Sequence, residues 1–314
     1  MGIFISALIF TAGIILVVKG GDIFVDAATW IAHAAGIPTF IIGATIVSLA
    51  TTMPEMIVSC LAAAQGKVDM AIGNAVGSVT ANTGLIMALA FIFMIVIINR
   101  ADYIKQCVML VACSVILLAG SQHGQLSNIA SLLLVTIFTG FMALNVYQAK
   151  NSNTQNSAGK KQIAKNEIVK NILNFTVGIA MIVGGSQLLI NGGAQLAQAF
   201  GVPERIIAVT FVAIGTSLPE LITTITAIRK HESALSVGNI IGANVIDLSL
   251  ILPASSLIAG KALPVSEMVL KFDFTACLAV LLTALVPLLI REKASRFHGI
   301  ILLAAYMVYI AVTV

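Results

Sequence analysis

The chain has 314 residues, of which 59% are hydrophobic and only 10% are charged, and its formal net charge is +4. A soluble domain is typically about one-quarter charged, so this composition excludes a soluble globular protein and predicts a polytopic membrane protein. The low charge also leaves no basic surface for nucleic acid, and the four cysteines lack metal-ligand spacing, which favours a packing role for them.

Ten apolar segments along the chain are long enough to cross a bilayer, which takes roughly 20 helical residues. Alternating strand patterning is absent, which favours a helical bundle. The first segment has no basic flank or cleavage site, so we expect a retained span. The expected spans are 3–19, 39–64, 70–98, 104–120, 127–149, 170–190, 205–228, 234–260, 264–290 and 298–314.

A polar stretch over 150–169 divides the chain into two five-span halves, 1–149 and 170–314. With an odd number of spans per half, the second half must enter the membrane from the opposite side, which is the inverted-repeat plan of many secondary transporters. Thirteen of the 17 Lys and Arg residues fall on the linker side of the expected topology. The positive-inside rule therefore predicts a cytoplasmic linker and both termini outside. The membrane is expected to be a prokaryotic inner membrane.

Each half contains a copy of one segment, with a Pro-Glu pair inside an apolar run. The copies read GIPTFIIGATIVSLATTMPEMIVS (36–59) and GVPERIIAVTFVAIGTSLPELITT (201–224), a constant offset of 165 residues. The offset pairs Glu55 with Glu220, and it continues into GNAVGSVTAN (73–82) and GNIIGANVID (238–247), where Asn82 pairs with Asp247. Ionisable residues inside a membrane are costly and usually mark a function, so the repeat predicts an ion site shared by the two halves.

The chemistry around each proline favours a hard cation. Pro54 cannot donate a backbone hydrogen bond, so the carbonyl of Ala50 loses its helical partner, and we expect the kink to free neighbours such as the carbonyl of Ser48. Oxygen ligands without His or Cys suit calcium, which takes 6–8 oxygens, and sodium, which has a similar radius. The expected donors are Thr51, Thr52 and Glu55 in the first copy, and Ala213, Gly215, Thr216, Ser217 and Glu220 in the second.

VAIGTSLPELITT followed by VGNIIGANVID resembles the α-repeat signature of the cation/calcium exchanger superfamily, the sodium/calcium exchangers, and the first copy fits it less closely. The resemblance covers nearly the whole chain. It implies two repeat glutamates that face each other near the midplane and bind calcium, with sodium in flanking sites. Carried over by position, it implies that Glu55 and Glu220 are ligands shared by calcium and sodium, and that Thr51 and Thr216 give oxygen to calcium. For the sodium sites it implies backbone carbonyls from Ser48 and Ala213 and side chains from Thr52, Ser78 and Ser217. Asn82 and Asp247 would line the central site.

The expected function is sodium/calcium antiport by alternating access. The expected partners are calcium and sodium ions and the membrane lipid, and we expect neither a cofactor nor an obligate protein partner. Ala50 stands where the family usually has Gly, and Thr52 stands where it usually has Ser, a mild change because the hydroxyl is kept. Ala243 replaces a family serine that serves a sodium site. Proton/calcium exchange and potassium-dependent exchange, on which the position of Asp247 bears, therefore stay open as alternatives. A passive channel would differ by passing calcium without counterflow. An intramembrane hydrolase is disfavoured because neither HExxH nor GxSxG occurs.

The resemblance also implies that the first and sixth helices slide past the rest of the bundle. Two glycine pairs, Gly20–Gly21 and Gly184–Gly185, are expected near the ends of these helices, either to permit that movement or as ordinary loop glycines. Asp22 and Asp26 are likewise expected near a helix end, where water solvates them.

Overall fold

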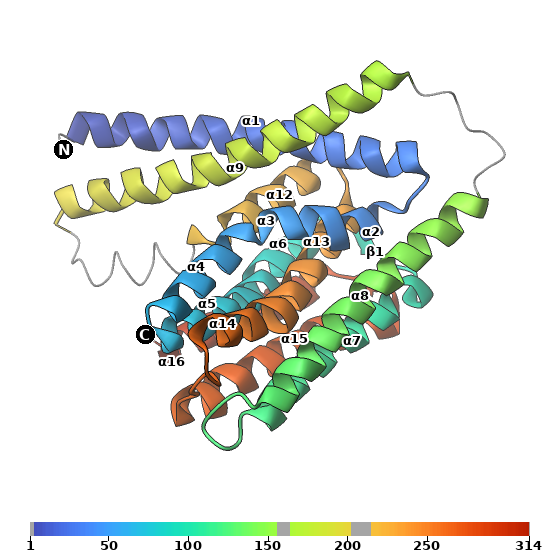
Figure 1. Cartoon of the computed structure of the whole chain (residues 1–314). Coiled ribbons are helices and arrows are strands. Elements are labelled where there is room, and N and C mark those ends of the chain that lie inside the picture. The colour runs from blue at the N-terminus through green and yellow to red at the C-terminus, as the bar shows by residue number, and fades with distance from the viewer. Residues whose placement is uncertain (1–2, 156–163, 202–214, 314) are drawn as a thin grey trace.

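The computed structural model describes residues 3–155, 164–201 and 215–313, which are almost entirely helical (Figure 1). The α-helices are α1 (Ile3–Ala35), α2 (Thr39–Ile42), α3 (Ser48–Thr51), α4 (Met53–Ala64), α5 (Val68–Ala81), α6 (Ala88–Phe93), α7 (Arg100–Gly120), α8 (Asn128–Gln155), α9 (Lys165–Ala199), α12 (Leu218–Arg229), α13 (Ser233–Ile246), α14 (Leu252–Ala259), α15 (Phe274–Arg291) and α16 (Arg296–Thr313). Four π-helical segments, Gly43–Val47, Asn82–Met87, Asp247–Ile251 and Val269–Asp273, continue these helices, and β1 (Val96–Ile97) pairs antiparallel with β2 (Lys293–Ala294).

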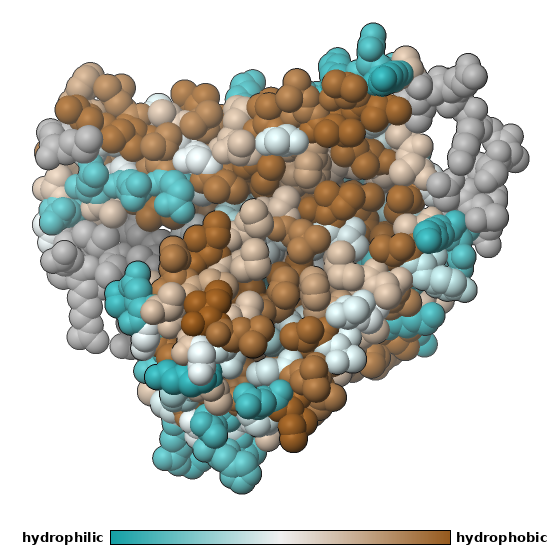
Figure 2. All heavy atoms as spheres, viewed as in Figure 1, coloured by the Kyte–Doolittle hydropathy of each residue, from teal (hydrophilic) through white to brown (hydrophobic). Residues whose placement is uncertain are grey.

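Within the described ranges, eight helices are long and apolar enough to cross a membrane, or nine if the bent pair Thr39–Thr51 and Met53–Ala64 forms one span. The expected span 205–228 lies partly outside the described residues, so the number ten and the inversion of the second half stay predictions. Large apolar side chains such as Phe4 (75%) and Leu257 (81%) are exposed. Figure 2 shows apolar residues over most of the visible face and hydrophilic ones toward the helix ends. This pattern is that of a multi-pass membrane protein.

The helices α1 and α9 are much longer than the expected spans 3–19 and 170–190, and they lie against each other outside the main bundle (Figure 1). The glycines explain the difference. A Cβ added to Gly20 would lie 2.7 Å from the Cβ of Met181, and one added to Gly185 would lie 2.8 Å from the Cβ of Leu16. These glycines therefore let two antiparallel helices approach closely, and the prediction that they mark helix ends is wrong.

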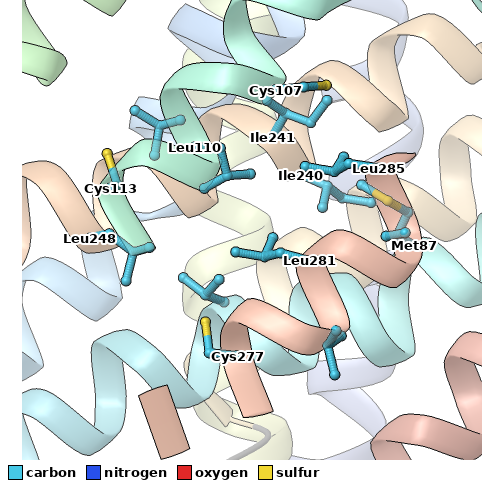
Figure 3. Close-up of a cluster of buried hydrophobic side chains, with 14 of the residues drawn as sticks. Met87, Cys107, Leu110, Cys113, Ile240, Ile241, Leu248, Cys277, Leu281 and Leu285 are labelled. Carbon is cyan, nitrogen blue, oxygen red and sulfur yellow. The ribbon is translucent and has the colours of Figure 1, made fainter. Parts of the chain in front are cut away.

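The centre of the bundle is the span formed by α13 and α14. In its most apolar window 94% of the residues are buried, against 22% in the corresponding windows of α1 and α9. Around Ile240 and Ile241 of α13, apolar residues of α7 and α15 form one continuous cluster (Figure 3). Cys107, Cys113 and Cys277 are buried in this cluster, and all four cysteines are free thiols, as a packing role requires.

Two acidic residues of α1 bind the end of α12. Asp22 pairs with Arg229 (Oδ1–Nη1, 3.4 Å), and Asp26 pairs with Lys230 (Oδ1–Nζ, 2.6 Å). The prediction that Asp22 and Asp26 lie near a helix end is wrong because α1 continues to Ala35. These contacts, called the α1–α12 ion pairs below, connect α1 to the bundle.

Candidate ion-binding site

Each repeat glutamate lies at the start of a helix that has a proline in its first turn. The axis bends by 45° between Thr39–Thr51 and Met53–Ala64, because Pro54 lacks the N–H that would continue the helical ladder. Glu55 lies in the first turn of α4, and Glu220 lies in the first turn of α12, beside Pro219. The free N–H groups and the dipole at a helix N-terminus favour a negative charge. Each of these helix starts therefore places a carboxylate where the end of the helix favours a negative charge.

The three acidic side chains of the repeat blocks are all buried inside the protein. Glu55 is 1% exposed, and Glu220 and Asp247 are 0% exposed. Glu55 interacts electrostatically with both others, and Asp247 interacts with Glu220. The hydroxyl of Thr52 donates to Glu220 Oε1 across 3.2 Å, which joins the two halves. Within the described residues, the remaining five carboxylate oxygens accept no hydrogen bond. Buried carboxylates without partners need a cation or a proton.

Asn82 and Asp247 occupy equivalent places in the local structure as well as in the repeat. Each is the first residue of a π-helical segment, Asn82–Met87 and Asp247–Ile251. Such wide turns within α-helices occur frequently at functional sites. The amide of Asn82 donates to Asn244 Oδ1 (3.2 Å), and Asn244 Nδ2 donates to Thr83 Oγ1 (2.8 Å). This chain of hydrogen bonds leaves Asn82 Oδ1 without a partner among the described residues.

The hydroxyl groups of the site differ between the two halves. The hydroxyl of Ser217 donates to Ser78 Oγ across 3.3 Å. The offset pairs these two residues with Thr52 and Ala243. Alanine has no side-chain acceptor, and the hydroxyl of Thr52 donates to Glu220. Ala243 is fully buried, so the departure from the family pattern lies within the bundle.

One expectation about the backbone is wrong, and another falls outside the described residues. The carbonyl of Ser48 is not freed by the kink, because it accepts the N–H of Thr52 at 2.9 Å, and the hydroxyl of Ser48 donates to the carbonyl of Thr45. The proline acts on Ala50, four residues before it, and not further along the helix. Ala213, the expected counterpart of Ser48, lies outside the described ranges.

The structure adds three asparagines to the expected set. Asn74 and Asn239 accept hydrogen bonds from Thr216 and Thr51, and Asn244 orients Asn82. Asn74 and Asn239 are identical in both copies of the repeat, so the offset contained a signal for them. The offset pairs Asn244 with Val79, which gave no signal.

The donor set selects the kind of ion. In the described part of the chain, no three residues of the types His, Cys, Asp and Glu are grouped closely enough to hold a metal on their own. The site therefore combines carboxylates with hydroxyl and amide oxygens, most of them neutral. Such oxygen-only surroundings suit a hard cation with many ligands, and they suit zinc or copper poorly.

Comparison with known proteins gives the family. The model of the family described as sodium/calcium exchanger protein matches residues 5–147 and 170–314. The chain belongs to this sodium/calcium exchanger family. The inner membrane protein YrbG of Escherichia coli is 32% identical over 95% of this chain and 94% of its own length. The sodium/calcium exchanger MaX1 of Methanosarcina acetivorans is 28% identical over 98% of both chains.

A solved structure of the sodium-calcium exchanger NCX_Mj, soaked with Na+ and Sr2+, superimposes with a TM-score of 0.85, at 26% identity and over 99% of each chain. Members of the exchanger family are transporters and not enzymes, and they carry sodium and calcium ions. The chain is thus a multi-pass membrane transporter of the cation/calcium antiporter class.

Proposed function

We propose that this exchanger moves sodium against calcium through one site at mid-membrane, with Glu55 and Glu220 as the shared ligands. The observation that carries the proposal is the pair of buried carboxylates from opposite repeats, which interact electrostatically, which have oxygens without a hydrogen-bond partner among the described residues, and one of which, Glu220, accepts a hydrogen bond from Thr52 of the other repeat. Together with Asp247, the site can hold up to three negative charges, which one calcium ion or several sodium ions would balance.

Competition for this set of oxygens is enough for antiport. An uncompensated buried charge costs several kcal/mol, so the protein would change its access only when cations or protons balance the carboxylates. A ligand shifts a conformational equilibrium only by its different affinity for the two states. Calcium and sodium would therefore take turns in one site instead of leaking through together, which distinguishes an exchanger from a channel.

The roles of the other residues follow as part of the proposal. Thr51 and Thr216 would provide oxygen to calcium, Asn82 and Asp247 would line the central site, and the sodium sites would use oxygens of Ser48, Thr52, Ser78, Ser217 and the carbonyl of Ala213. Since the carbonyl of Ser48 already accepts the N–H of Thr52, an ion there would use its second lone pair.

An asymmetry between the halves supports alternating access. A Cβ added to Gly21 of α1 would lie 2.6 Å from Thr226 Oγ1, so α1 packs tightly on α12. The equivalent pair, α9 and the bent span, is separated by a groove of about 480 Å³ whose lining includes Pro54, Ile57 and Val183. In a second state of the same chain, α9 would pack tightly on the bent span, and the groove would instead lie between α1 and α12. We propose that α1 and α9 slide together to make that exchange.

The orientation would set which side is closed. With the linker in the cytoplasm and both termini outside, the α1–α12 ion pairs would lie toward the cytoplasm, whereas the groove, lined by Thr176 and Gln187 on either side of the middle of α9, would lie near mid-membrane. The arrangement then corresponds to a state closed on the cytoplasmic side.

Ala243 favours a second candidate for the coupling ion. Its equivalent, Ser78, pairs with Ser217, whereas Ala243 contributes no side-chain oxygen to the other flank. A proton or a potassium ion could then replace sodium at that flank, with calcium as the common cargo.

Calcium uptake into proteoliposomes tests the function. The purified chain is reconstituted, and uptake is measured under an imposed sodium, proton or potassium gradient, with no gradient as the fourth arm. Sodium-driven uptake supports the proposal, proton-driven or potassium-driven uptake supports the alternative, and equal uptake in all arms indicates a channel. Glu55→Ala is expected to abolish uptake, whereas Glu267→Gln, at a side chain 79% exposed, is the matched control.

A further inference from the structure

We infer that Asn74 and Asn239 are positioning residues of the ion site, each fixing the hydroxyl of a threonine in the opposite repeat. The inference rests on the proposed role of Thr51 and Thr216 as ligands. The hydroxyl of Thr51 donates to Asn239 Oδ1 at 3.2 Å, and that of Thr216 donates to Asn74 Oδ1, also at 3.2 Å. The offset of 165 converts one bond into the other, so a single interaction occurs twice and crosses between the halves both times.

The direction of these hydrogen bonds follows from the surroundings of Asn74. Its Nδ2 donates to the backbone carbonyl of Glu55 (3.1 Å) and to Ser59 Oγ (2.9 Å). A carbonyl oxygen can only accept, so the nitrogen of this amide must face Glu55 and its oxygen must face Thr216. Thr216 then has to donate its only hydroxyl proton to Asn74. For Thr51 and Asn239 the structure gives the same direction, with the hydroxyl of Thr51 donating to Asn239 Oδ1.

A hydroxyl that has given its proton away presents lone pairs to a cation. An amide is a suitable acceptor because it is neutral and adds no charge to the three carboxylates. Without Asn239, the proton of Thr51 has another acceptor in the carbonyl of Ser48, at 3.4 Å. The hydroxyl would then rotate, and its oxygen would no longer face the ion in the same way. Asn74 also joins the backbone of Glu55 to Thr216, which connects the start of α4 to the residues just before α12.

Asn239 offers the cleaner test, since it is fully buried and its Nδ2 has no partner among the described residues. Asn239→Leu therefore removes the bond to Thr51 and leaves no described acceptor unsatisfied. Asn239→Ala serves in its place if the leucine variant does not fold, as judged by its elution and melting temperature. Thr51→Val removes the hydroxyl that Asn239 is inferred to hold.

The experiment is a double-mutant cycle on the KM for calcium, measured with the full chain in proteoliposomes. Loss of one hydrogen bond of ordinary strength corresponds to an increase of about fivefold in KM, with kcat within about twofold. Asn239→Leu is expected to have this effect in the natural chain and in Thr51→Ser, which keeps the hydroxyl. It should have no further effect in Thr51→Val, and its full effect in Thr216→Val.

The possible outcomes separate the inference from the function on which it rests. A role limited to packing would make the effect of Asn239→Leu equal in every background, which would overturn the positioning role and leave the ion site standing. If Thr51→Val leaves the KM for calcium unchanged, the threonine is not a ligand and the inference fails with it. The uptake assay on Glu55→Ala decides independently whether the site itself is correct.

Discussion

Neutralising the two aspartates that connect α1 to α12 is expected to shift the balance between the access states. The offset of 165 places Gln187 and Asn191 at the positions of Asp22 and Asp26, and it places Ala64 and Gln65 at those of Arg229 and Lys230. The α1–α12 ion pairs therefore have no charged counterpart in the other half. An interaction present in only one of two related states makes their populations unequal.

The size of the effect follows from exposure. The side chains of Asp22 and Arg229 are 31% and 58% exposed, and those of Asp26 and Lys230 are 70% and 25% exposed. Each such surface pair contributes about 0.5 kcal/mol. Asp22→Asn combined with Asp26→Asn should thus remove about 1 kcal/mol, a factor of about five in the equilibrium between states.

The assay is the apparent affinity for calcium measured separately from each face of oriented proteoliposomes. Apparent affinity scales with the fraction of protein in the competent state. The face served by the minor state should gain up to about fivefold in affinity, while the other face changes little. Glu267→Gln removes a comparable surface charge pair with Lys271 elsewhere and should change neither face.

Charge reversal sharpens the test. Asp22→Arg combined with Arg229→Asp restores opposite charges and should restore the natural affinities. If the neutral double variant leaves the affinities of both faces within twofold of the natural chain, α1 does not leave α12 during transport, and the sliding proposal is refuted.

Three further predictions concern the site and the helix packing. Glu55→Gln and Glu220→Gln should each reduce exchange more than about 100-fold, yet raise the melting temperature in cation-free detergent, because fewer buried carboxylates then lack a partner; calorimetry and uptake measure both. Ala243→Ser should increase the sodium affinity of transport several-fold, about the value of one hydrogen bond, and an unchanged sodium dependence would contradict it. Gly185→Leu should disrupt folding, since even a Cβ there would lie 2.8 Å from Leu16 Cβ. Gly184→Ala, where an added Cβ meets no atom of the described residues within 4 Å, should be tolerated in a thermal-unfolding assay.

Local chemistry explains why much of the site could be predicted. A long apolar segment indicates a membrane span from its composition alone, and a proline inside a helix kinks or breaks that helix. Glu55, Glu220 and Asp247 were therefore recognisable as acids in membrane spans, and the offset paired the first two by position alone. All three residues are buried in the structure, and their role as ion ligands stays a prediction.

The length of α1 and the partners of its acidic residues were decided by tertiary structure. A Gly-Gly pair is compatible both with a helix end and with a close helix crossing, and only the approach of α9 made it a crossing. The ion pair of Asp22 with Arg229 joins residues more than 200 positions apart, and the repeat offers no template for it.

By itself, the sequence determined the membrane class, the twofold repeat and which acidic residues lie in apolar segments. Each of these can be recognised from local composition or by comparing one segment with another. Only the tertiary structure decided which oxygen faces which donor, as in the crossed bonds of Thr51 with Asn239 and of Asn82 with Asn244. Hydrogen bonds depend on angstrom-scale distances between distant segments, and those distances are set by how the helices pack.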